Sequence, residues 1–264
     1  MTLAQDLDYL LQELRVEEVP MAMEAKWRLL RGTLNRRIPL PVSADFIEVQ
    51  DRVLAQWRQE EPIATLADCT ATDTAGIWLW QGDITRLQVD AIVNAANSVM
   101  LGCFEPNHHC IDNQIHTFAG VQLRLACAEI KKSRQGRPLK VGEAVITQAY
   151  NLPSRHIIHT VGPRIQVRDT AQPLKVSAMM QDLLAKCYVE CLQLAEQNGC
   201  HTLAFCGIST GEFRFPADLA CQIAVATVQN YLAQRASDLQ VIFVTYSEHD
   251  TQLYRQALLK GESV

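Results

Sequence analysis

Short apolar runs alternate with longer amphipathic stretches over most of the chain after Gly76, and this alternation constrains the fold more than any other feature of the sequence. The amphipathic stretches, of which residues 178–196 are the clearest, carry apolar side chains at helical spacing. Strands that alternate with helices predict an α/β sheet covered by helices on both faces. The predicted strands are residues 77–80, 91–93, 144–146, 156–161, 203–205 and 241–244.

The beginning of the chain follows a different pattern. Leucines recur at helical spacing between residues 3 and 14. After a proline-containing break, Ser43 stands where the N-cap of a further helix is expected, ahead of another apolar stripe. We therefore expect an N-terminal helical extension over residues 1–70 and an α/β domain over residues 71–264.

Composition excludes several classes of partner. The formal net charge is -5 and the pI is about 5.8, which argues against a general binder of nucleic acid or of anionic membranes. A small anionic ligand remains compatible, because backbone N–H groups hold a diphosphate without side-chain charge.

Targeting and redox signals point to the cytoplasm. We find no secretory signal and no apolar run of the roughly 18 residues that a membrane helix needs. The nine cysteines are odd in number and lie mostly inside apolar segments. Free thiols in a reduced, cytoplasmic setting are therefore expected.

Two loops that follow predicted strands are candidates for binding a ligand, because ligands of open α/β sheets lie beyond the carboxyl ends of strands. Residues 82–85 place Asp83 where it could accept from the amine of a base, although Gly-Asp is also ordinary turn chemistry. Residues 207–213 contain two glycines before a helix, so their N–H groups could converge on an anion or serve only a turn.

A third loop carries metal-binding residue types. Residues 94–97 read Asn-Ala-Ala-Asn, and Cys103, His108 and Cys110 follow within a short polar stretch. Thiolate and imidazole groups are zinc ligands, and three of them leave a coordination position free for water or substrate. The spacing leaves open whether His108 or His109 binds, and His116 is a rival further ligand.

Taken together, these motifs resemble the macrodomain family. Residues 82–85, 94–97 and 207–213 are similar to that family's adenine, distal-ribose and diphosphate elements and follow in the same order, within a similarity covering about residues 76–250. The resemblance implies a three-layer α/β/α fold with a central mixed sheet. One stretch departs from it, because residues 102–113 replace the glycine-rich run of ordinary macrodomains.

That departure resembles a zinc-dependent macrodomain subgroup, the protein-ADP-ribose hydrolases found with sirtuin-type ADP-ribosyl transferases in some microbes. The N-terminal helical extension also fits this subgroup. The resemblance assigns Cys103, His108 and Cys110 to zinc, so analogy rather than spacing selects the histidine. It also implies a functional link to a sirtuin-type ADP-ribosyl transferase.

The resemblance further implies roles for individual residues. Asp83 and the backbone of Ile84 would bind adenine, and Asn97 would hold the distal ribose, which Ile111 and Asp112 should also face. Asn97 and Asp112 are the expected catalytic residues, with Asp112 positioning water. The residues expected to wrap the diphosphate and ribose are Ser209, Thr210, Gly211, Glu212 and Phe213.

The expected activity is zinc-dependent hydrolysis that removes mono-ADP-ribose from a protein side chain. The bond expected to be cleaved is an ester to Asp or Glu, and the product is free ADP-ribose. Zinc would either activate water or polarise the scissile linkage. The expected partners are ADP-ribose and a mono-ADP-ribosylated protein, with neither nucleic acid nor membrane. The alternative is a non-catalytic ADP-ribose reader with a structural zinc.

Overall fold

The computed structural model describes residues 2–59, 62–166 and 176–259. Within these residues seven strands form one sheet in the order β1-β2-β7-β6-β3-β5-β4. The strands are β1 (Thr70–Ala71), β2 (Ile77–Gln81), β3 (Ala91–Ala95), β4 (Ala144–Gln148), β5 (His156–Thr160), β6 (Thr202–Phe205) and β7 (Gln240–Thr245).

The sheet is mixed, with a parallel centre. β2, β7, β6, β3 and β5 are parallel, whereas β1 pairs antiparallel with β2 and β4 pairs antiparallel with β5. The carboxyl ends of five parallel strands therefore meet at one edge. The six strands predicted from sequence are confirmed. Sequence analysis misses β1, whose two residues are both exposed.

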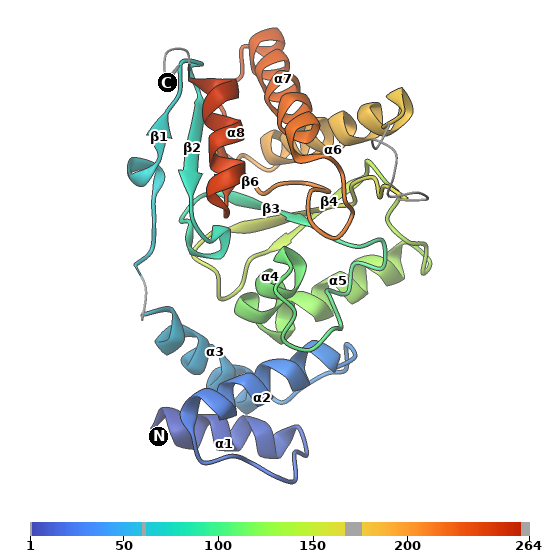
Figure 1. Cartoon of the computed structure of the whole chain (residues 1–264). Coiled ribbons are helices and arrows are strands. Elements are labelled where there is room, and N and C mark those ends of the chain that lie inside the picture. The colour runs from blue at the N-terminus through green and yellow to red at the C-terminus, as the bar shows by residue number, and fades with distance from the viewer. Residues whose placement is uncertain (1, 60–61, 167–175, 260–264) are drawn as a thin grey trace.

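Helices cover both faces of the sheet (Figure 1). One face packs against α6 (Ala178–Gln197), α7 (Ala217–Arg235) and α8 (Glu248–Leu258). The opposite face packs against α4 (Ile111–Ala119) and α5 (Val121–Ser133). The predicted three-layer α/β/α arrangement around a mixed sheet is confirmed.

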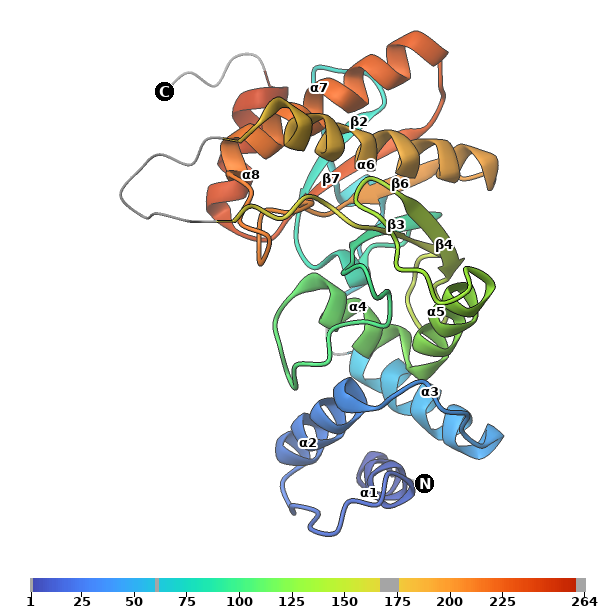
Figure 2. The ribbon, with the colours of Figure 1, turned by 90° about the vertical axis from the view of Figure 1, so that its right-hand side faces the viewer.

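The N-terminal residues are helical, as predicted, and form α1 (Leu3–Glu13), α2 (Met23–Arg36) and α3 (Ala44–Arg58). Ser43 is the N-cap of α3 and accepts from the N–H of Phe46 at 3.1 Å. Both views place this unit below α4 and α5 (Figures 1 and 2). The unit has its own core, which Val121 on α5 joins.

In the parts of the chain that the structure describes, no helix combines the length and the apolar character needed to cross a membrane. All nine cysteines lie within the described residues and all are free thiols.

Candidate active site

A cleft of about 1140 Å³ lies at the edge where the parallel strands end. The loops after β2, β3, β6 and β7 all contribute to its wall, as expected for an open α/β sheet. The structure brings every site residue predicted from sequence to this one cleft. These residues are Asp83, Ile84, Asn97, Cys103, His108, Cys110, Ile111, Asp112, Ser209, Thr210, Gly211, Glu212 and Phe213.

The three predicted metal ligands converge in space. The candidate ligand atoms of Cys103, His108 and Cys110 all lie within 4.8 Å of one another. Sγ of Cys103 is 3.6 Å from Nδ1 of His108. Tetrahedral zinc with S and N ligands at 2.0–2.3 Å requires ligand separations of roughly 3.5–3.8 Å, a range that includes the distance between Cys103 and His108.

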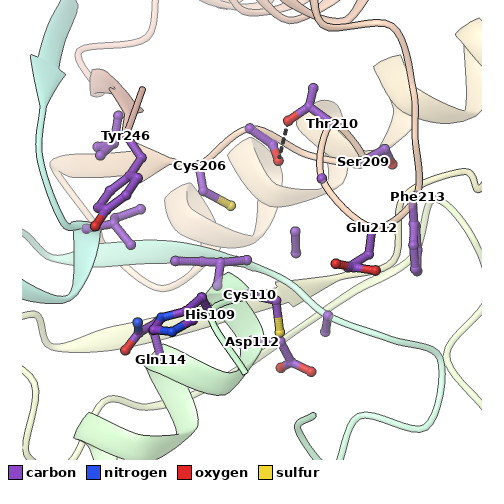
Figure 3. Close-up of a pocket in the computed structure, with 18 of the residues that line it drawn as sticks. His109, Cys110, Asp112, Gln114, Cys206, Ser209, Thr210, Glu212, Phe213 and Tyr246 are labelled. Carbon is purple, nitrogen blue, oxygen red and sulfur yellow. Dashed lines mark hydrogen bonds between the residues drawn. The ribbon is translucent and has the colours of Figure 1, made fainter. Parts of the chain in front are cut away.

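The structure distinguishes His108 from His109, between which the spacing does not choose. His108 faces Cys103, whereas His109 is exposed at the cleft beside Gln114 (Figure 3). His116 belongs to a different buried group, with Cys127 and His159.

Cys110 is the N-cap residue of α4. The three candidate metal ligands Cys103, His108 and Cys110, called here the metal group, therefore lie at a helix N-terminus. The pKa of the Cys110 thiol is raised to about 12, mainly by burial and to a smaller extent by the neighbouring Cys103 and Asp112. A bound cation would oppose that effect by stabilising the thiolate.

Asp112, in the first turn of α4, is almost fully buried and held by two asparagine side chains. Its Oδ1 accepts from Nδ2 of Asn94 at 2.8 Å, and its Oδ2 accepts from Nδ2 of Asn97 at 3.1 Å. Asn97 also donates to the carbonyl of Gly102 at 3.1 Å. Burial raises the pKa of Asp112 to about 6, although these hydrogen bonds and Arg124 lower it. The paired asparagines thus fix the carboxylate at the floor of the cleft.

A buried polar chain continues below Asp112. The same Nδ2 of Asn94 lies 3.1 Å from Nδ1 of His159, and Nε2 of His159 lies 3.0 Å from the hydroxyl of Thr147. Since the Asn94 amide is the donor, His159 is neutral with its proton on Nε2. Burial lowers the pKa of His159 to about 4. His159 is therefore a satisfied core residue.

Asp83 begins the loop after β2 and has a structural role there. Its Oδ1 accepts from the N–H of Thr85 at 2.9 Å and from the hydroxyl of Thr85 at 2.8 Å. It caps the short 3₁₀ helix Ile84–Arg86 while lining the cleft. Asp83 can therefore both stabilise this turn and face a ligand in the cleft.

Sequence analysis misses Tyr246, which lines the cleft with 84% of its surface exposed. Tyr246 directly follows β7, which lies between β2 and β6 in the sheet. The rule that ligands bind beyond strand ends would have identified it if applied to this strand. Figure 3 shows Tyr246 across the cleft from Phe213.

The 207–213 loop is tightly packed at its base. Ser209 has a left-handed backbone conformation with a φ of 69°, and a Cβ added at Gly162 would lie 2.0 Å from its hydroxyl oxygen. The buried Ser209 hydroxyl has no hydrogen-bond partner among the described residues. Oε1 of Glu212 lies 3.5 Å from Nε2 of His108, so this loop reaches across to the metal group.

Comparisons with known proteins agree with this geometry. The family model described as Macro domain matches residues 93–224. A Staphylococcus aureus protein named "Protein-ADP-ribose hydrolase" is 49% identical over 258 residues, covering 95% of this chain and 94% of the relative.

Two further relatives extend the comparison. A Fusarium oxysporum protein named "Probable bifunctional ADP-ribose hydrolase/ADP-ribosyltransferase" is 41% identical over 254 residues, covering 89% of this chain and 41% of the relative. The structure of a Trypanosoma brucei macrodomain in complex with ADP-ribose covers 85% of this chain and 94% of that chain, with 28% identity and a TM-score of 0.64. From its fold and from these relatives, the chain belongs to the Macro domain family.

Proposed function

We propose that this protein is a zinc-dependent hydrolase that removes mono-ADP-ribose from modified protein side chains. The observation that carries the proposal is the position of Cys103, His108 and Cys110. They line the same cleft as Asp112 and the 207–213 loop. Relatives similar over almost the whole chain are named protein-ADP-ribose hydrolases, which supports the hydrolytic part.

The donor set fits zinc. Two thiolates and an imidazole are borderline-soft ligands, and the 3.6 Å between Sγ of Cys103 and Nδ1 of His108 suits two ligands of one tetrahedral ion. With three protein ligands the fourth position would remain free, as in catalytic rather than structural zinc sites. A zinc ion there would supply Lewis-acid chemistry next to the substrate, by lowering the pKa of water toward about 7 or by polarising the scissile linkage.

The residues around the metal group would hold the distal ribose and the attacking water. Asn97 extends from the end of β3 and is fixed by its bond to Asp112. Asp112 is rigid because both its oxygens accept hydrogen bonds. In this arrangement Asn97 orients a ribose hydroxyl and Asp112 positions water. Ile111 would form the apolar side of the sugar site.

The other half of the cleft suits a nucleoside diphosphate. The loop from Ser209 to Phe213 precedes α7, where backbone N–H groups and the helix dipole favour an anion. Asp83 and Ile84 lie at the end of β2, on the side where we place adenine. A macrodomain solved with ADP-ribose shares this fold, which supports ADP-ribose as the ligand.

We propose an ester to Asp or Glu as the cleaved linkage. A carboxylate leaves without being protonated, so hydrolysis of this ester demands the fewest proton transfers from the site. We also propose a functional link to a sirtuin-type ADP-ribosyl transferase. A Fusarium relative whose name combines the hydrolase and transferase activities supports pairing with a transferase.

One experiment separates this proposal from a non-catalytic reader and from a structural-zinc protein. Mono-ADP-ribosylated protein is incubated with this protein, with and without chelator, while free ADP-ribose and circular dichroism are followed. The hydrolase releases ADP-ribose until the metal is removed, and its fold survives. A reader binds ADP-ribose and releases none, and a structural-zinc protein unfolds on chelation; either result would refute the proposal.

A further inference from the structure

The 103–110 loop, which carries the proposed metal ligands, has no helix or strand of its own. A metal site needs its ligand atoms held within a few tenths of an ångström. Inside the loop, the described bonds include one between the N–H of His108 and the carbonyl of Glu105, at 3.3 Å. The geometry of this loop therefore depends on the elements packed against it.

Arg31 on α2 is the first of these supports. Its Nη2 donates to the carbonyl oxygen of His108 at 2.8 Å and to Oδ1 of Asn113 at 3.0 Å. Asn113 is fully buried on α4, and its Nδ2 donates to the carbonyl of Glu105 at 2.9 Å. One guanidinium thus ties the backbone of a ligand residue to the helix that begins after Cys110.

Asn35, one turn further along α2, is the second support. Its Oδ1 accepts from the N–H of Asn107 at 2.9 Å, and its Nδ2 donates to the hydroxyl of Thr117 at 3.3 Å. Asn35 is only 2% exposed, so both of its partners replace water. Asn107 has a left-handed backbone with a φ of 55°, which this hydrogen bond helps to hold directly before His108.

Gly32 explains how α2 comes so close to the loop. A Cβ at this position would lie 2.8 Å from Nδ2 of Asn107 and 3.6 Å from Cβ of Pro106. Glycine is unfavourable inside a helix, so its presence in α2 needs a packing reason. The close approach of the loop supplies that reason. Arg31, Gly32 and Asn35 form the α2 face that contacts the loop.

The C-terminal end of α2 is anchored as well. Nη1 of Arg124 on α5 donates to the carbonyls of Leu34 at 2.8 Å and of Asn35 at 3.0 Å. The same guanidinium lies 4.6 Å from the ring centroid of Phe104, which follows the ligand Cys103. A cation bonded to the last carbonyls stabilises the helix end. The start of the loop at Phe104 is thus linked to α2 through Arg124, and its later part at Asn107 and His108 contacts α2 directly.

The N-terminal helices pack together on a core of their own beneath this contact. Trp27 on α2 stacks on Trp57 of α3 with ring centroids 4.2 Å apart. Figures 1 and 2 agree in placing α2 directly below α4, where the loop ends.

We infer that the Arg31–Gly32–Asn35 face of α2 positions the metal ligands of the 103–110 loop, so that the N-terminal helices are a working part of the active site. The inference rests on the proposed zinc site. It gives the extension a function that extends beyond folding: the loop holds a tight tetrahedral set only while α2 is in contact with it.

The test uses the full chain and three substitutions. Arg31→Met keeps the aliphatic stem and removes the donors to His108 and Asn113, and Asn35→Ala removes the acceptor for Asn107. Arg28→Met makes the same chemical change on the exposed side of α2 and is the control. The zinc dissociation constant is measured by competition with a chromophoric chelator. The thiolate-to-cobalt absorption of the Co²⁺-loaded protein reports the ligand geometry.

We expect Arg31→Met and Asn35→Ala each to weaken zinc binding about tenfold or more, as for other residues that orient ligands, and to alter the cobalt spectrum. Arg28→Met should match wild type. The inference is overturned if folded Arg31→Met and Asn35→Ala keep wild-type affinity and spectrum. If Asn35→Ala does not fold, Arg31→Met decides alone, because its stem still packs. A wild-type protein that binds no zinc would instead refute the proposed function.

Discussion

Glu212 and the proposed ligand Cys103 approach opposite nitrogens of His108. Oε1 of Glu212 lies 3.5 Å from Nε2, and Sγ of Cys103 lies 3.6 Å from Nδ1. This arrangement directs Nδ1 toward the metal group and places the Glu212 carboxylate beside Nε2. Carboxylates that accept from metal-binding histidines fix the tautomer of the imidazole and increase its basicity.

The first prediction therefore concerns Glu212. We expect Glu212→Ala to weaken zinc binding about tenfold, because His108 loses the carboxylate that lies beside its Nε2. Asp218→Asn removes the same charge from the exposed start of α7 and should leave the affinity unchanged. Chelator competition on both variants measures the effect. Equal affinities for the two would show that Glu212 acts on the substrate alone.

A second prediction separates binding from turnover at Asp112. Replacing Asp112 with alanine removes the carboxylate that fixes Asn97 and that we propose positions water. We expect kcat to fall by about 10²–10⁴. Affinity for free ADP-ribose should change much less, since the diphosphate loop is untouched. Calorimetric titration and single-turnover release of ADP-ribose give the two numbers. A variant with wild-type kcat would remove Asp112 from the mechanism.

The base of the 207–213 loop gives a third prediction. In Gly162→Ala the new Cβ would meet the hydroxyl of Ser209 at 2.0 Å and a methyl group of Ile208 at 2.8 Å. The loop must shift, so we expect ADP-ribose to bind at least about tenfold more weakly, or about 1.4 kcal/mol. Gly136→Ala strains the backbone as well, because Gly136 has a φ of 73°, but it lies in a turn outside the cleft and should retain the affinity. Unchanged titration curves for Gly162→Ala would argue against this loop as the diphosphate site.

The fourth prediction concerns stability and pH at His159. Burial disfavours the charged imidazolium and lowers the pKa of His159 from its ordinary value of 6.5 to about 4 in the folded protein. As the pH falls, His159 is therefore protonated in the unfolded chain before it is protonated in the folded protein. Stability is fully present above pH 6.5 and is lost toward pH 4, by up to about 3 kcal/mol.

His159→Gln should accordingly reduce the loss of unfolding free energy between about pH 7 and about pH 4.5. Urea unfolding at the two pH values measures it, and the exposed His201→Gln serves as the control. The comparison uses the change with pH, so any constant cost of the substitution cancels. A pH dependence identical to wild type would mean that His159 is protonated alike in both states.

The sequence predicts the sheet and its ligand loops well, because both depend on local signals. Apolar runs identify six strands, and the loops at residues 82–85, 94–97 and 207–213 follow strands that end at one edge. β1 is missed because two exposed residues carry no hydrophobic pattern.

Contacts between distant segments could not be predicted. Arg31 and His108 are 77 residues apart and meet only because α2 packs under α4. The approach of Glu212 to His108 also depends on how two loops lie across the cleft. Spacing could likewise not choose between His108 and His109, whereas the folded loop orients one toward Cys103 and exposes the other.

The most direct test of zinc-dependent hydrolysis measures free ADP-ribose released from mono-ADP-ribosylated protein by the Cys103→Ala, Cys110→Ala double variant, compared with wild type. Both proteins are stripped of metal and resupplied with zinc, and their folding is checked by circular dichroism. We predict that zinc restores release by wild type and that the folded double variant releases none. Full release by the metal-free double variant would show that hydrolysis needs neither zinc nor these two cysteines.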